Sequence, residues 1–289
     1  DPFHAASAGV LPALLGGMCV EIHADRDPLF GGLSPEPIAP NLDALRDEVR
    51  CRRASVGLAF DGDGDRLGAV DERGRVVTAQ EVLAVLALHL RRVRRESGAI
   101  VKTVSCTALL DAIAKQEGLQ LVETPIGFKH IAAKMASDKV LIGGEESGGY
   151  GIPRHLPERD GAYSGLLLLE AVAAARAPLS HLVRRLQSEF GPWAYRRVDV
   201  HLPEGTILRD DFADRIQTAL AARLPAMGFT VARWNRLDGV KAIGDDGWLL
   251  VRPSGTEPVV RVYAEARRPA AVSRLLATGK GIVYSEARA

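Results

Sequence analysis

The chain has 289 residues, of which 47% are hydrophobic and 25% are charged, and this composition is typical of a folded globular protein. Its length is sufficient for two or three domains, each of roughly 100–200 residues with its own core. Lysine and arginine total 37 against 36 aspartates and glutamates, so the charge balance does not favour nucleic acid as a partner.

Apolar runs rich in valine, isoleucine and leucine alternate with amphipathic helical patterns, which predicts the α/β class. We expect two consecutive α/β domains with mixed, largely parallel sheets, followed by a smaller α+β domain. In the first part of the chain the pattern predicts helices over residues 7–15 and 42–52, and strands over residues 19–22 and 56–60.

A second unit is expected to begin near Val77. It is predicted to contain helices at residues 80–95, 108–117 and 131–135, and strands at 99–104, 119–122 and 140–142. Two further helices are expected at residues 161–175 and 179–190, before a clear break at Gly191-Pro192. Beyond the break we expect a strand at 194–201, a helix at 210–223, and several strands that include 248–251 and 259–264. The predicted domains are therefore residues 1–76, 77–190 and 191–289.

The cysteines and the apolar segments indicate in which cellular compartment the protein is expected. Cys19, Cys51 and Cys106 are too few and too scattered for a disulfide framework, which fits a reducing cytoplasm. The most apolar stretches, residues 82–90 and 166–175, fall short of the roughly 20 residues that cross a bilayer, so no membrane partner is expected.

The first residue is not methionine and no signal sequence follows it, so Asp1 is interpreted as an internal starting point.

An acidic loop follows the predicted strand 56–60. Asp61, Asp63 and Asp65 alternate with glycines and are followed by Arg66. Clustered carboxylates repel one another unless a cation lies among them, and the glycines allow the backbone to curl around one. An EF-hand calcium loop is a poorer interpretation, because Arg66 occupies the position where that motif requires glycine. Mg²⁺ at the end of a strand is the better interpretation.

Two further loops carry polar groups suited to ligands. After the predicted strand 140–142, Glu145 and Ser147 lie in a glycine-rich segment, and carboxylates and hydroxyls of this kind bind sugar hydroxyls; an ordinary turn is the alternative. Residues 124–130 form a turn that ends in Lys129 and His130, which are able to meet phosphate or to move a proton, although a lone lysine is usually a solvated surface group.

A phosphate-binding loop is predicted between the last two strands. Arg252 offers a charge-assisted fork of donors, Ser254 and Thr256 offer hydroxyls, and a turn at Gly255 can direct backbone N–H groups toward an anion. A dianionic phosphate is the expected ligand, and a β-turn capped by serine and threonine is the alternative.

Four motifs together resemble the α-D-phosphohexomutase family. They are D-G-D-G-D-R at 61–66, T-P-I-G-F-K at 124–129, G-E-E-S-G-G at 144–149 and R-P-S-G-T-E-P at 252–258. They occur in the family's order, and the resemblance extends from Asp1 to about Thr278 and includes residues 30–37. The resemblance implies four domains around a deep cleft, of which this chain would supply the second, third and fourth.

The resemblance also implies a role for each candidate residue. Asp61, Asp63 and Asp65 would bind Mg²⁺, and Arg66 and Lys129 would line the reaction centre. Glu145 and Ser147 would hold the sugar. The non-reacting phosphate would be held by Arg252, Ser254, Gly255 and Thr256.

The sequence departs from the family pattern in one respect. The family's first domain carries a phosphoserine loop of the T-A-S-H-N-P type, and the sequence has no counterpart of that loop. In the implied mechanism, phosphoserine donates its phosphoryl group to a hexose phosphate, and a bisphosphorylated intermediate then reorients and returns the other phosphate. A missing N-terminal domain is therefore an expected partner, and this chain alone is expected to be inactive.

Several alternatives concern function and substrate. The T-P-I-G-F-K and G-E-E-S-G-G forms look most like phosphoglucomutases, which interconvert glucose 1-phosphate and glucose 6-phosphate. Phosphomannomutase or a dual-specificity mutase is the alternative, and an amino-sugar mutase is a weaker one. A shortened homologue that only binds sugar phosphate is a second class of function. A metal-dependent sugar phosphatase is a third class, but the sequence offers no nucleophile for it.

Overall fold

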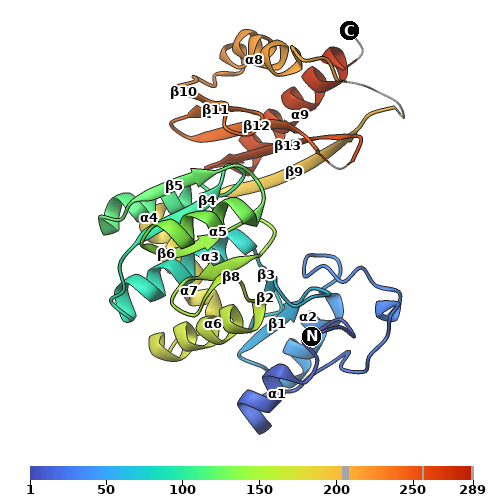
Figure 1. The fold of residues 1–289 in the computed structure, drawn as a ribbon, viewed down its shortest axis with the longest axis vertical. Coiled ribbons are helices and arrows are strands. Elements are labelled where there is room, and N and C mark those ends of the chain that lie inside the picture. The colour runs from blue at the N-terminus through green and yellow to red at the C-terminus, as the bar shows by residue number, and fades with distance from the viewer. Residues whose placement is uncertain (204–207, 256, 288–289) are drawn as a thin grey trace. The chain divides into compact units, whose positions relative to one another are not determined.

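The structure is a computed structural model that describes residues 1–203, 208–255 and 257–287. The chain forms two compact units, Asp1–Phe190 and Gly191–Ala289 (Figure 1). Among the described helices, none is by itself long and apolar enough to cross a membrane. One bent pair, Gly161–Ala175 with Leu179–Phe190, meets the criterion by length and composition only, and its two helices are bent by 81°.

The first sheet of unit 1 is a three-stranded antiparallel meander. Strands β1 (Val56–Phe60), β2 (Leu67–Asp71) and β3 (Val76–Val77) pair in that order, and the connections between them are short turns. Helix α2 (Asp43–Arg52) packs against β1 and β2. Antiparallel strands can be joined by short turns, whereas parallel strands need a long crossover, so pairing within residues 56–77 is necessarily antiparallel.

The N-terminal 40 residues differ from the prediction in two places. Helix α1 spans Val10–Leu15 rather than residues 7–15, because Gly9 has φ +79° and ends the turn that precedes the helix. The predicted strand at 19–22 is wrong: these residues form no ladder, and Val20 is 59% exposed, so the apolar run is not a buried strand. Short 3₁₀ turns lie at Gly16–Met18 and Phe30–Gly32.

The second sheet of unit 1 has the strand order β5-β4-β6-β7-β8. Its strands are β4 (Ala99–Thr103), β5 (Leu121–Thr124), β6 (Val140–Gly144), β7 (Tyr150–Ile152) and β8 (Leu156–Arg159). Strand β4 pairs in parallel with β5 and β6, whereas β7 and β8 are added as an antiparallel hairpin. The α/β class with sheets of mixed orientation is confirmed. The expectation of largely parallel pairing is wrong for the first sheet, which is antiparallel throughout, and parallel pairing among the described strands is confined to β4, β5 and β6.

Helices cover both faces of this second sheet. Neighbouring residues of a strand point to opposite faces. A Cβ atom on Gly143 would meet Ile131 of α5 (Phe128–Ser137), whereas one on Gly144 would meet Leu83 of α3 (Ala79–Leu88). Helices α5 and α3 therefore lie on opposite faces. Helix α4 (Leu109–Glu117) contacts α3, and α3 continues into a π-helical turn at His89–Val93.

Helix α6 (Gly161–Ala175) contacts both sheets of unit 1, through β1 and β2 on one side and β7 on the other. Its N-terminus is fixed by Asp160, whose carboxylate accepts a hydrogen bond from the Tyr163 N–H at 2.8 Å. Helix α7 (Leu179–Phe190) follows and packs on α3 and α6. Both helices begin and end where the sequence pattern predicts.

Unit 2 is a five-stranded antiparallel sheet in the order β10-β11-β12-β13-β9 with helices on one face. Its strands are β9 (Ala194–His201), β10 (Arg233–Asn235), β11 (Val240–Gly244), β12 (Gly247–Pro253) and β13 (Val259–Ala266). Helices α8 (Phe212–Arg223) and α9 (Pro269–Glu286) contact each other and the sheet (Figure 1), and a 3₁₀ turn at Pro225–Met227 follows α8. Strand β9 has the predicted bounds, whereas α9 is a helix that the sequence analysis did not predict.

Candidate functional site

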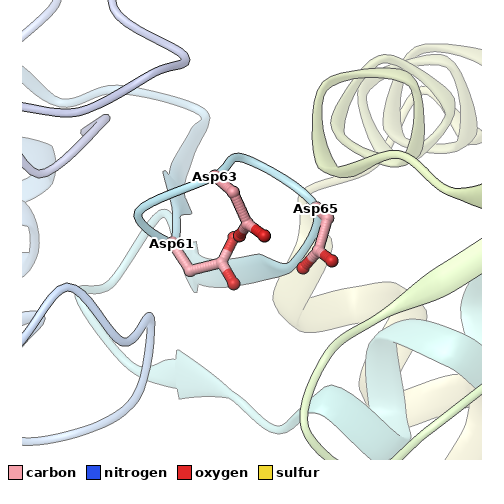
Figure 2. Close-up of side chains that lie close together, drawn as sticks. All are labelled: Asp61, Asp63 and Asp65. Carbon is pink, nitrogen blue, oxygen red and sulfur yellow. The ribbon is translucent and has the colours of Figure 1, made fainter. Parts of the chain in front are cut away.

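The acidic loop is the connection of the β1–β2 hairpin. Asp61, Asp63 and Asp65 each offer a carboxylate oxygen, and these atoms all lie within 4.8 Å of one another. Figure 2 shows the three side chains projecting from this one loop toward a common region. Gly64 adopts φ +78°, a conformation that favours glycine, so the glycine spacing noted in the sequence has a conformational cause at this position.

Arg66 closes the acidic loop on itself. Its backbone N–H donates to Asp61 Oδ1 at 2.9 Å, and its Nε lies 3.3 Å from Asp61 Oδ2. Asp61 is only 6% exposed, so this charged contact is made largely out of water. The structure therefore places Arg66 beside the predicted metal ligands.

The electrostatics of the loop fit a cation. Burial is the largest cause that raises the pKa of Asp65 to about 6; the neighbouring carboxylates Asp61 and Asp63 raise it too, and the Arg159 guanidinium opposes them. Asp65 Oδ1 is buried and has no hydrogen-bond donor within the described part of the chain. A buried carboxylate oxygen without a donor, within 4.8 Å of two further carboxylates, suits a hard divalent cation.

Three segments of the site begin where parallel strands end. The carboxyl ends of β4, β5 and β6 lie at the same edge of the sheet, which is where ligands bind in α/β folds. Ser105 follows β4, the 124–130 turn follows β5, and Glu145 follows β6. The topology thus explains why separate sequence motifs meet at one place.

Glu145 and Glu146 tie these segments together. Glu145 is 6% exposed, and its Oε1 accepts the Gly127 N–H at 3.1 Å, which joins the β6–β7 loop to the turn before Lys129. Burial raises the pKa of Glu145, and the charge of Glu146 raises it further. Glu146 Oε2 accepts the Ser105 hydroxyl at 2.5 Å, a residue that the sequence analysis did not single out.

The acidic loop and the glycine-rich loop are in direct contact. Leu67 N–H donates to the Gly148 carbonyl at 2.9 Å, and Arg66 forms an isolated antiparallel bridge with Gly149. Gly148 has φ +96°, and a Cβ atom there would lie 2.8 Å from the Leu67 carbonyl oxygen. Two of the predicted motifs therefore form one surface in unit 1.

Lys129 and Ser147 lie beside this surface with free polar ends. Lys129 is exposed on the first turn of α5, and Ser147 is half-buried in the β6–β7 loop. Neither side chain makes a hydrogen bond or ion pair with another described residue. Both are available to a ligand.

Arg159 is a site residue that the sequence analysis missed. It ends β8, and its Nη2 lies 2.6 Å from Asp65 Oδ2 while its Nη1 lies 3.7 Å from Glu145 Oε2. Its guanidinium carbon also lies 5.3 Å from the centroid of the Phe128 ring. In the sequence, Arg159 is distinguished only by its position directly before Asp160-Gly161, at the start of a predicted helix. That position does not by itself indicate a binding site.

The predicted phosphate loop belongs to unit 2, but it begins later than expected, because Arg252 and Pro253 are the last residues of β12 and pair with β13. Arg252 Nε donates to Asp238 Oδ1 at 2.8 Å, so this arginine has a carboxylate partner, and Ser254 N–H donates to the Val259 carbonyl at 2.8 Å. A Cβ atom on Gly255 would have no heavy atom within 4 Å, so the loop is open at that point. Thr256 lies outside the described residues.

Three models of one family match the chain in succession. Phosphoglucomutase/phosphomannomutase alpha/beta/alpha domain II matches residues 1–74, alpha/beta/alpha domain III matches residues 78–190, and the C-terminal domain matches residues 204–278. The chain belongs to the phosphoglucomutase/phosphomannomutase family.

Individual relatives agree with this assignment. A phosphoglucomutase/phosphomannomutase of Thermococcus kodakarensis is 32% identical over 272 residues, which are 92% of this chain and 56% of the relative. A probable phosphoglucosamine mutase of Methanothermobacter thermautotrophicus is 34% identical over 253 residues, 87% of this chain and 52% of the relative. The crystal structure of a putative phosphomannomutase from Thermus thermophilus has a TM-score of 0.80 at 34% identity, and the match covers 98% of this chain and 60% of that one. The chain spans a little over half the length of these relatives.

Proposed function

We propose that this chain is part of a phosphohexomutase, which moves a phosphoryl group between C1 and C6 of a hexose phosphate. One observation carries the proposal: the acidic loop, the turn before Lys129, the Glu145 loop and Arg159 form a continuous set of contacts in unit 1. A cluster of carboxylates flanked by arginine and lysine, next to the buried Glu145 carboxylate and the free Ser147 hydroxyl, suits phosphoryl transfer to and from a sugar.

Asp61, Asp63 and Asp65 are the proposed Mg²⁺ ligands. Bound there, the ion would supply positive charge to neutralise phosphoryl oxygens. Arg66 and Lys129 add fixed positive charge at the same place, and because the Arg66 guanidinium lies against Asp61 its position is set before a ligand arrives.

Glu145 and Ser147 are the proposed sugar-binding groups, since a buried carboxylate and a free hydroxyl accept and donate hydrogen bonds to hexose hydroxyls. Arg252, Ser254, Gly255 and Thr256 are proposed to bind a phosphate group. In this role Arg252 would keep Asp238 as one partner and offer its remaining N–H groups to the anion.

The phosphoryl carrier is proposed to be a serine outside residues 1–289, in a domain that precedes the three matched by the family models. We assign residues 1–76, 77–190 and 191–289 to family domains II, III and IV, and expect the protein to work in the cytoplasm. The 289-residue chain alone is then expected to bind hexose phosphate without turning it over.

Glucose phosphate is the proposed substrate from the forms of the two motifs, with mannose phosphate as the alternative. The names of the relatives add glucosamine phosphate as a competitor, because several of them are called phosphoglucosamine mutases.

Isothermal titration of the 289-residue chain with glucose, mannose and glucosamine 1-phosphates, with and without Mg²⁺, tests binding and ranks the sugars. Phosphorus NMR of the same samples detects conversion. We expect binding that depends on Mg²⁺ and no conversion to the 6-phosphate. Interconversion of the 1-phosphate and the 6-phosphate at an ordinary enzymatic rate would contradict the proposal that the phosphoryl-carrying serine lies outside residues 1–289. Release of inorganic phosphate would indicate a phosphatase instead.

A further inference from the structure

Arg159 is in contact with both the acidic loop and the Glu145 loop. Its Nη2 is 2.6 Å from Asp65 Oδ2, and its Nη1 is 3.7 Å from Glu145 Oε2. The side chain is 25% exposed, so these contacts are partly shielded from solvent screening. A single guanidinium therefore has a carboxylate partner in each of the two proposed binding sites.

The surroundings hold Arg159 in this position. A Cβ atom on Gly149 would lie 2.5 Å from Arg159 Cδ, so the absence of a side chain at 149 makes room for the arginine's aliphatic stem. The guanidinium lies over the Phe128 ring, and its buried Nε lies 3.6 Å from Glu158 Oε1 without a hydrogen bond to any described residue. The stem and ring fix the side chain, while the guanidinium retains donor capacity that the two carboxylates do not use.

The contact with Asp65 also orients a proposed metal ligand. Asp65 Oδ2 is occupied by Arg159, whereas Oδ1 is buried and has no donor among the described residues. Arg159 thus directs one oxygen of this carboxylate toward the acidic cluster. Neutralising Asp65 with a cation would weaken its attraction for Arg159 and leave the guanidinium free to act on Glu145 and on an anionic ligand beside it.

We propose that Arg159 is a positioning residue that couples the two sites, so that cation binding at Asp61, Asp63 and Asp65 strengthens hexose phosphate binding at the Glu145 loop. This inference rests on the proposed function. By linkage the coupling is reciprocal, so hexose phosphate raises the affinity for the cation by the same factor.

Titration calorimetry of the 289-residue chain measures this factor directly. The Mg²⁺ dissociation constant is determined with and without saturating glucose 1-phosphate, and the ratio of the two is the coupling factor. We expect a ratio of at least about 5 for the unaltered chain. In Arg159→Met the ratio is expected to fall at least about threefold, since direct attraction between cation and phosphate is common to both proteins and only the arginine-dependent part is lost.

Two further variants separate positioning from folding. Arg159→Lys keeps the charge but has one ammonium that cannot span both carboxylates, so it is also expected to lose coupling. Gly149→Ala keeps the arginine and displaces its stem, with the same expectation. If Arg159→Met does not fold, these two variants provide the result. Arg154→Met is the matched control, because Arg154 lies on the same hairpin, is 69% exposed and pairs with Glu96.

The outcomes are distinct. Equal coupling in the unaltered chain, Arg159→Met and Arg159→Lys would overturn the inference while leaving the proposed function intact. An unaltered chain that binds neither Mg²⁺ nor any of the three hexose 1-phosphates would overturn the proposed function and this inference with it. Loss of coupling in Arg154→Met as well would show a general structural effect and would also overturn the specific role of Arg159.

Discussion

The backbone N–H of Leu67 donates to the carbonyl of Gly148 at 2.9 Å, and this hydrogen bond joins the hairpin that carries the acidic loop to the loop that carries Glu145. Gly148 adopts φ +96°, and a Cβ atom there would meet the Leu67 carbonyl oxygen at 2.8 Å. The junction thus depends on a residue without a side chain, both for its conformation and for its space.

Gly148→Ala is therefore expected to destabilise unit 1 by about 2–4 kcal/mol, since a strained backbone conformation and a contact with rigid backbone add together. Chemical denaturation followed by circular dichroism measures the change. Gly255→Ala is the control, because a Cβ atom at 255 has no neighbour within 4 Å, and it is expected to change stability by less than about 1 kcal/mol. Equal stability of Gly148→Ala and the unaltered chain would contradict the role given to this junction.

Asp63→Asn is expected to weaken Mg²⁺ binding at least about tenfold, because loss of a direct ligand should cost no less than loss of an outer-shell partner. Titration calorimetry with Mg²⁺ measures the affinity. Asp47→Asn on α2 serves as the control, since Asp47 is exposed and pairs only with Arg50 among the contacts described. Unchanged Mg²⁺ affinity in Asp63→Asn would remove Asp63 from the set of ligands.

Lys129→Met is expected to weaken binding of glucose 1-phosphate by about tenfold or more, since a charge-assisted hydrogen bond contributes about 1.5–3 kcal/mol. Lys134→Met is the matched control, because Lys134 lies on the same helix, five positions after Lys129, and pairs with Asp138. Both proteins are compared by titration calorimetry. Equal losses in the two variants would show that general positive charge, rather than Lys129 itself, attracts the ligand.

Glu145→Gln tests the electrostatic cost of the buried carboxylate. Burial raises the pKa of Glu145 above its ordinary value of 4.5, so the folded state binds its proton more tightly than the unfolded state does. The ionised carboxylate therefore costs stability at neutral pH, and this cost disappears as pH falls below 4.5. The stability of Glu145→Gln relative to the unaltered chain is expected to increase from about pH 4 to about pH 7.

Denaturation curves of both proteins, recorded at pH values across that range in the absence of divalent cations, check this expectation. Glu36→Gln is the control, because Glu36 is exposed and its side chain makes no hydrogen bond or ion pair with another described residue. A stability difference that stays constant or decreases with rising pH would contradict the raised pKa.

The acidic loop, the Glu145 loop and several elements could be predicted because their signals are local. Helices α6 and α7 follow apolar periodicity, and the acidic loop is contiguous in sequence. Helix α9 was not predicted, although Pro269 stands at its first position and Val272, Leu275 and Leu276 recur at helical spacing. Gly279 and Gly281 lower the helix propensity of its second half. A Cβ atom on Gly279 would lie 2.6 Å from Val262 Cγ1, so the glycine serves close packing of α9 on β13, which only the folded chain reveals.

Arg159 illustrates the same limit at the site. Its contacts with Asp65 and Glu145 exist because the β7–β8 hairpin folds back beside β6, and β7 is only three residues long. Nothing local distinguishes this arginine from the many others in the chain. Ser105 was missed for a similar reason, since its partner Glu146 lies 41 positions away.

Helix α6 limits how the chain can be divided into modules. A Cβ atom on Gly165 of this helix would contact Leu58, Phe60 and Leu67, all of which are buried on β1 and β2. A fragment that ended at residue 76 would lack α6, and the side chains of Leu58, Phe60 and Leu67 would then be exposed to solvent. The sequence boundary near residue 76 is thus unsuited to cutting or recombining the chain, and residues 1–190 are the smallest piece that we expect to fold with the acidic loop intact.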